Sequence, residues 1–251
     1  MTGRMFIIRW VENIALFSRL TAATLWRVPL IRKNWNLTHT QMKTIGLESL
    51  PLVIITALFV GAATVIQAHM QFQGFIPLSY LGFAVSKSIV TELGPVLTAF
   101  VVASRISTAI AAEIGSMKTT EQIDALHCLS LDHLRYVVVP KFVASVLMLP
   151  VLVIFCELIA FASSTVTALL VTNVTLYEYV AGLKLFFNPF DMFLGIFKTT
   201  FFGGAIALSG AYFGLSCEKG AEGIGNATTR AFMLSAILIL IIDFFVAFLF
   251  L

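Results

Sequence analysis

Residues 92–126 read ELGPVLTAFVVASRISTAIAAEIGSMKTTEQIDAL, and this stretch decides the fold. Its first part is apolar, with small residues at every fourth position and therefore on one face of a helix: Ala99, Ala103, Ser107, Ala111 and Gly115. In lipid, such a ridge lets the backbone of a neighbouring helix approach closely. The sequence turns polar at Glu113. We therefore expect a membrane helix that ends near this residue.

A short amphipathic helix is expected directly after this membrane helix. Thr119 and Gln122 have the spacing of a capping box, and Glu121 and Asp124 lie in the first turns that follow. Apolar residues at helical spacing give the segment one apolar side: Ile123, Leu126 and Leu129. The alternative is an ordinary membrane helix followed by a solvated loop helix with no special role.

The composition indicates an integral membrane protein. The 251 residues are 59% hydrophobic and only 12% charged, whereas soluble domains are about half apolar and about a quarter charged. A spanning helix needs about 20 predominantly apolar residues. Five stretches meet this requirement: residues 47–68, 86–112, 136–171, 190–215 and 231–251. The third is long enough for a helix of roughly 50 Å, so that it either protrudes from the bilayer or is kinked at Pro150.

The basic residues predict the orientation in the membrane. Seven of the 16 lysines and arginines precede the first span, which by the positive-inside rule places the N-terminus in the cytoplasm. Five spans then place the C-terminus on the periplasmic side. Residues 1–46 form a separate N-terminal region, in which residues 5–30 predict a basic amphipathic helix on the membrane surface. The alternative is that this helix packs on another subunit. Because no nucleic-acid-binding module accompanies the basic residues, no nucleic acid is expected as a partner.

Five ionisable residues fall inside the predicted spans: Glu92, Arg105, Glu157, Lys198 and Asp243. Charges in a bilayer are costly and are usually paired or functional. Lys198 and Asp243 lie at similar depths, roughly 12 Å below the outer surface, so we predict that they pair, with Glu157 as a competing acceptor. In the alternative, each meets water in a lipid-accessible cavity. Glu92 is either a helix-start residue or a carboxylate that faces such a cavity.

No metal site or disulfide is predicted. The three cysteines, Cys128, Cys156 and Cys217, form no CxxC pair, and the four histidines show no zinc-ligand spacing. No nucleophile or acid–base pair is evident either, so catalysis by this chain is not expected. The sequence also contains no GxxxxGK[ST] motif for nucleotide phosphates.

Two long blocks of the sequence resemble the MlaE/YrbE permease family, the membrane subunits of ABC-type lipid transporters linked to MCE proteins. The first comprises ELGPVLT at residues 92–98, AAEIGSM at 111–117 and TEQIDAL at 120–126. The second comprises residues 198–214, KGAEGIG at 219–225 and ATTRA at 227–231. The similarity extends from about Glu48 to the C-terminus. Residues 47–251 are thus identified as an MlaE-like permease domain.

The resemblance implies a fold, a function and partners. The fold would be all-α, with the N-terminal interfacial helix, five transmembrane helices and a short cytoplasmic coupling helix. The chain would be an inner-membrane permease that moves phospholipid or a related lipid to or from a periplasmic MCE-type protein. It would form a homodimer with two cytoplasmic ABC ATPase subunits, which would bind ATP and Mg²⁺ in place of this chain.

Two sets of residues carry these expectations. Those expected to couple to the ATPase are Glu113, Thr120, Glu121, Gln122, Asp124 and Leu126. Those expected to line the substrate cavity are Glu92, Gly94, Pro95, Glu157, Lys198 and Asp243. The alternative function is a self-contained ion-coupled carrier or channel, in which the intramembrane charges form an ion path.

Overall fold

The computed structural model describes residues 2–72, 77, 80–172, 174–185 and 188–250, and every regular element among them is helical. The all-α class predicted from the sequence is confirmed. The chain begins with α1 (Thr2–Arg27), a 3₁₀ segment η1 (Val28–Asn34) and α2 (Trp35–Gly46). A short 3₁₀ turn, η2 (Leu47–Ser49), leads into α3 (Leu50–Phe72). The helical stretch 35–72 therefore runs without a break across the predicted boundary at residue 46.

The second half of the bundle contains two π-helical turns. The helix α4 (Leu81–Ser88) continues through the π segment η4 (Ile89–Leu93) into α5 (Gly94–Thr119). The short α6 (Gln122–Cys128) follows, and a second π segment, η5 (Leu134–Val138), opens α7 (Val139–Val171). The chain ends with α8 (Leu176–Leu185), α9 (Pro189–Leu215) and α10 (Ala221–Phe250). Because α7 stays helical through Pro150 for 33 residues, it extends beyond a hydrocarbon core of about 30 Å.

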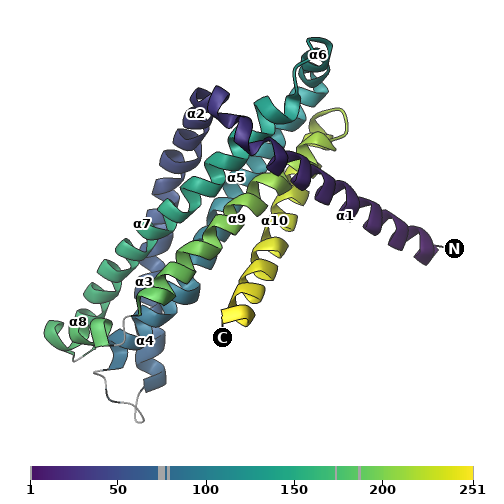
Figure 1. Ribbon diagram of the computed structural model, residues 1–251. Coiled ribbons are helices and arrows are strands. Elements are labelled where there is room, and N and C mark those ends of the chain that lie inside the picture. Colours follow the sequence, from purple (N-terminus) through teal and green to yellow (C-terminus); the bar gives the residue numbers. More distant parts are fainter. Residues whose placement is uncertain (1, 73–76, 78–79, 173, 186–187, 251) are drawn as a thin grey trace.

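Within the described residues, six helical stretches are long and apolar enough to cross a membrane. Four of them contain one predicted span each, Ala221–Phe250 covers the last predicted span up to residue 250, and the sixth is Val11–Ile31 in α1 and η1. In the most apolar part of this sixth stretch, only 6% of the residues are buried inside the structure, whereas 61% are buried in the corresponding part of α9. In Figure 1, α1 runs across the other helices and carries the N-terminus away from them. Its position on the membrane surface stays a prediction.

Small residues bring the central helices into close contact, as predicted. A Cβ atom on Gly210 of α9 would lie 2.7 Å from the backbone oxygen of Ser107 on α5. A Cβ atom on Gly203 of α9 would lie 2.4 Å from the backbone oxygen of Ser145 on α7. These separations are too short for any side chain, so glycine is required for α9 to lie between α5 and α7. The small-residue ridges of the second and fourth spans are thus used for helix packing within one chain.

The segment between the fourth and fifth predicted spans, residues 216–230, is glycine-rich and is expected to be a cytoplasmic loop, but the structure is helical there from Ala221 onward. Only residues 216–220 connect α9 to α10, and Gly220 is the one glycine there with a left-handed backbone, at φ 100°. Gly223 lies in the first turn of α10, where a Cβ atom would be 2.2 Å from the backbone oxygen of Glu218. This glycine therefore allows the turn to fold tightly against the helix and does not signal a loop.

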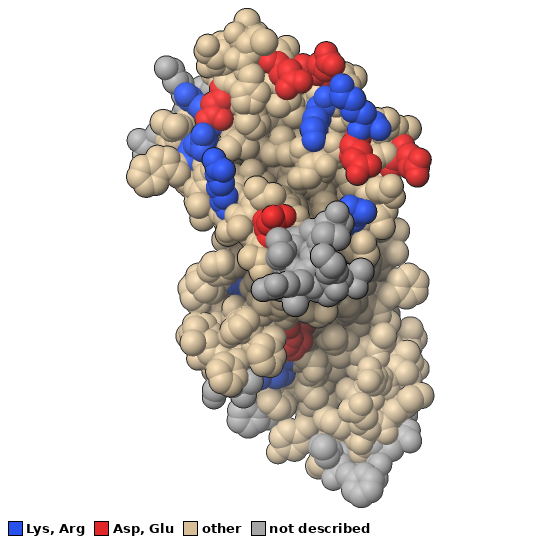
Figure 2. All heavy atoms as spheres, turned by 90° about the vertical axis from the view of Figure 1, so that its right-hand side faces the viewer, with Lys and Arg blue, Asp and Glu red and all other residues tan. Residues whose placement is uncertain are grey.

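Charged side chains are concentrated at one end of the bundle. Figure 2 shows them over the end that carries α6, whereas the opposite half of this face is almost uncharged apart from one recess. The uncharged surface is what a lipid bilayer requires, because unpaired charges there are costly. The distribution agrees with a bundle that projects from the membrane at its α6 end.

Candidate functional site

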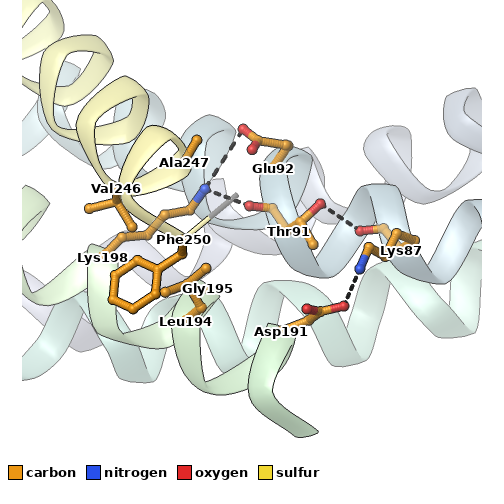
Figure 3. Close-up of a pocket in the computed structure, with 10 residues that line it drawn as sticks. All are labelled: Lys87, Thr91, Glu92, Asp191, Leu194, Gly195, Lys198, Val246, Ala247 and Phe250. Atoms are coloured by element: carbon orange, nitrogen blue, oxygen red, sulfur yellow. Dashed lines mark hydrogen bonds and ion pairs between the residues drawn. The ribbon is translucent and has the colours of Figure 1, made fainter. Parts of the chain in front are cut away.

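Lys198 forms the centre of a charged cluster inside the bundle. Its Nζ atom lies 2.6 Å from Oδ1 of Asp243 on α10 and 3.7 Å from Oε2 of Glu92 on the π turn η4. It also donates a hydrogen bond to the backbone oxygen of Thr91 (Figure 3). The predicted Lys198–Asp243 pair is confirmed. Lys198 is only 3% exposed, so the ion pair satisfies a charge that would otherwise be unpaired in the bundle.

The local sequence explains why the backbone of Thr91 can accept this bond. In an α-helix, the Thr91 carbonyl would receive the N–H of the residue four positions later, which is Pro95 and has none. Gly195 on α9 allows the close approach, because a Cβ atom there would lie 2.5 Å from the backbone oxygen of Val90. The Gly94–Pro95 motif and the π turn therefore create an acceptor, and Gly195 brings Lys198 to it.

Glu157, the competing acceptor, has a different environment. It lies on α7 and is 3% exposed. A Cβ atom on Gly94 would be 3.1 Å from its Cγ, so glycine at this position makes room for it. Its Oε1 atom is buried and has no hydrogen-bond partner within the part of the chain that the structure describes. Glu157 thus lies beside the predicted cavity motif without joining the Lys198 cluster.

Two cavities meet at Glu92. The first has a volume of about 360 Å³ and is lined from η4, α9 and α10 by residues that include Thr91, Glu92 and Lys198. Figure 3 shows Lys198 directed across it toward Glu92 and Thr91. The second, of about 410 Å³, lies on the α3 side and shares Lys87, Thr91 and Glu92 with the first. Gln67 and Gln71 add hydrogen-bonding groups to the second cavity.

The outer edge of the first cavity carries a second ion pair. Lys87 on α4 donates to Asp191 in the first turn of α9, and the Lys87 side chain is half exposed. Phe250, at the end of α10, also lines this cavity. The cavity therefore lies toward the end of the bundle opposite α6 and has both charged and apolar walls. Such a lining can accommodate a molecule with a polar and an apolar part.

The short helix predicted after the membrane helix is present as α6, but its predicted capping box is wrong. The residue before α6 is Glu121, whose backbone is left-handed at φ 61°, and it makes no side-chain cap. The Thr119 hydroxyl donates to the backbone of Ser116, while Gln122 Nε2 donates to Thr120 Oγ1 at 3.0 Å. The tight turn at Glu121 replaces the extended N-cap that a capping box requires.

The other predicted coupling residues are spread over this end of the bundle. Glu121 and Asp124 are exposed, and Leu126 is partly buried. Glu113 lies one helix earlier, on α5, where its carboxylate accepts a hydrogen bond from the buried Lys141 of α7 at 2.6 Å. The structure thus places Glu121 and Asp124 where a partner could reach them, whereas Glu113 ties α5 to α7.

Several contacts at this end were not foreseen from the sequence. Arg27 at the end of α1 pairs with Asp132, four residues after α6. Lys118 Nζ donates to the backbone oxygen of Cys217 at 2.9 Å, which joins α5 to the α9–α10 turn. Partial burial raises the pKa of Asp132, but hydrogen bonding to Arg27 and the charge of Arg27 outweigh it and hold the pKa below its ordinary value.

The long apolar helices among the described residues define a multi-pass membrane protein. The model of the family Permease MlaE matches residues 38–249. A probable ABC transporter permease protein of Rickettsia bellii is 35% identical over 97% of this chain and 94% of its own length. A probable ABC transporter permease protein of Synechocystis is 36% identical, covering 96% and 91%. The intermembrane phospholipid transport system permease protein MlaE of Haemophilus influenzae is 33% identical, covering 86% and 83%. The chain belongs to the MlaE permease family.

Proposed function

We propose that this chain is the membrane subunit of an ABC transporter for phospholipid or a closely related lipid. The observation that carries the proposal is the pair of cavities joined at Glu92, with buried Lys198 beside them. Cavities with both polar and apolar walls suit a molecule with a polar head and hydrocarbon tails. The name of the Haemophilus influenzae relative supports phospholipid as the substrate class. The MCE-type protein on the periplasmic side is part of this proposal.

In the proposed mechanism, the chain binds lipid and a separate ATPase supplies the energy. The exposed Glu121 and Asp124 on and beside α6 would contact the ATPase, and ATP and Mg²⁺ would bind to that subunit. Two ATPase subunits would present equivalent grooves, so two copies of this chain are expected. In the most apolar part of α10, only 11% of the residues are buried within one chain. That exposed surface makes α10 the proposed contact between the copies.

The proposed orientation has the N-terminus and α6 in the cytoplasm and the C-terminus in the periplasm. The cavities at Glu92 would then open toward the outer leaflet and the MCE-type partner. The gathering of charge at the α6 end supports this orientation (Figure 2). Labelling of single cysteines with a membrane-impermeant reagent in intact cells tests it, because only periplasmic positions react.

The decisive experiment purifies the complex in nanodiscs and identifies bound lipid by mass spectrometry. We expect a copurifying ATPase, two copies of this chain, and ATP hydrolysis that responds to lipid. The double variant Glu121→Lys, Asp124→Lys should lose the ATPase, or its response to lipid, while membrane insertion is retained. The matched control is Glu222→Lys, a carboxylate in the exposed first turn of α10.

The intramembrane charges also allow a second function, a self-contained ion-coupled carrier. Carboxylate oxygens of Glu92 and Asp243 each lie within 4 Å of Lys198 Nζ, and such a group of charges could form part of a proton or ion path. Ion flux through the purified chain in liposomes, without any ATPase, would favour this function. A complex with one copy of the chain and no ATPase would refute the transporter proposal.

A further inference from the structure

We infer that Arg27 and Asp132 are positioning residues that link the N-terminal helix α1 to the coupling segment, defined as residues 120–132. The inference rests on the proposed function, because the coupling segment is there the part that receives motion from the ATPase. In addition, the coupling segment would pass this motion to α1 as well as to the membrane helix α5.

One carboxylate joins three elements at this point. Oδ2 of Asp132 accepts a hydrogen bond from Nε of Arg27, and Oδ1 accepts one from the backbone N–H of Leu134 at 3.1 Å. The Arg27 guanidinium also donates to the backbone oxygen of Ala23 at 2.9 Å, which fixes it to the last turn of α1. The pair therefore connects the end of α1, the connection after α6 and the π turn that opens α7. Both side chains are about one-third exposed.

Few other contacts hold α1 in place. Tyr212 on α9 donates a hydrogen bond to Oδ1 of Asn13 at 3.2 Å, and its ring packs edge-on against Phe17 with centroids 5.6 Å apart. Most of the described apolar side chains of α1 are exposed; Trp26, for example, is 85% exposed. The polar contacts at Tyr212 and Asp132 therefore add to the limited packing of Phe17 and Leu20 in holding the described part of α1 against the bundle.

The position of α1 has a consequence for an apolar cavity. A space of about 620 Å³ lies between α1 with η1 on one side and α7, α9 and α10 on the other. Phe17, Leu25 and Val28 form the α1 side, and Phe142, Phe201 and Leu238 are among the residues opposite. If the coupling segment moves, Asp132 carries Arg27 with it, so that the width of this cavity changes. The link thus transmits motion from α6 to a membrane-level cavity without passing through α5.

The test measures the distance between α6 and α1 by pulsed electron paramagnetic resonance. Cys128 in α6 is exposed, whereas Cys156 and Cys217 are buried, so the native chain offers one labelling site. Ser18→Cys, on the exposed face of α1, supplies the second, and singly labelled chains report distances between copies. The full chain in nanodiscs should give a narrow distribution.

Loss of the pair should weaken the attachment of α1 to the coupling segment. Arg27→Gln or Asp132→Asn should lower the ratio of attached to detached α1 about fivefold, the change expected for a partly exposed ion pair. Arg27→Lys keeps the charge and should retain the narrow distribution. The matched control is Arg105→Gln, which breaks the Arg105–Glu48 pair, whose arginine is as exposed as Arg27. An unchanged distribution in both Arg27→Gln and Asp132→Asn, or equal broadening in Arg105→Gln, would overturn the inference.

A second measurement separates this inference from the proposed function. With the copurified ATPase, addition of ATP should leave the distance from α6 to α1 constant while the distance from α1 to a label on α10 changes. If no ATPase binds, the proposed function fails, and the first measurement alone decides on the link. If ATP moves α6 relative to α5 and α1 does not follow, the link is refuted.

Discussion

The loss in the free energy of unfolding should differ strongly between variants that remove Lys198 and variants that remove its partner Asp243. Lys198→Met leaves Asp243, whose side chain is 16% exposed, without a cation and beside Glu92. Loss of one partner of a buried pair costs about 3–5 kcal/mol. Asp243→Asn leaves Lys198 bonded to the Thr91 carbonyl and near Glu92. Its cost should therefore be that of one charged hydrogen bond, about 1–3 kcal/mol.

The double variant decides whether the two residues act as a pair. When both charges are removed, no unpaired buried charge remains, so the total cost should fall short of the sum of the single costs by about 2 kcal/mol. The free energy of unfolding, measured by denaturant titration in mixed micelles, gives all three values. Lys87→Met, in the half-exposed pair with Asp191, is the control and should cost less than about 1 kcal/mol. If the single costs simply add, the reasoning is refuted.

Three further outcomes follow from particular contacts. Gly203→Ala should destabilise the bundle by about 1–3 kcal/mol, because the new Cβ would meet the backbone oxygen of Ser145 at 2.4 Å. Gly225→Ala, in an open position on α10, should stabilise the bundle by up to about 1 kcal/mol in the same unfolding assay. If Gly203→Ala also raised the free energy of unfolding, the close packing at Gly203 would be contradicted. Burial and the neighbouring His127 lower the pKa of His133, so the unfolded segment binds a proton more readily and the α6–α7 connection should lose stability as the pH falls below about 6.5. Protection factors of the amides in residues 127–135, which correct for the intrinsic pH dependence of hydrogen exchange, should then fall from pH 7 to pH 5 in the wild type and change less in His133→Gln.

Properties that depend on residues within one helix could be predicted from the sequence. The five spans follow from apolar length, and the close contacts of α9 follow from small residues at fixed spacing. The Lys198–Asp243 pair could also be predicted, because depth in a membrane limits the partners available to a buried charge. The expected roles of Glu92, Gly94, Pro95 and Glu157 in substrate binding stay predictions.

Other contacts between separate segments could not be predicted, because neither depth in the membrane nor residue spacing limits their partners. Glycines in residues 216–230 indicated a loop, yet Gly223 serves a close backbone approach inside α10. Thr119 and Gln122 have capping-box spacing, but the left-handed turn at Glu121 prevents that cap. The Arg27–Asp132 pair joins residues 105 positions apart, and no periodic pattern connects them.

The bond from Lys198 to the carbonyl of Thr91 has a consequence for how this site tolerates change. A main-chain oxygen is present whatever side chain occupies position 91, so substitutions of the threonine do not delete the acceptor. The vulnerable position is instead Pro95, four residues along, because any other residue restores an N–H that competes for the same oxygen. A scan of single substitutions should thus find position 91 permissive and position 95 restrictive, although only the backbone of position 91 touches the lysine.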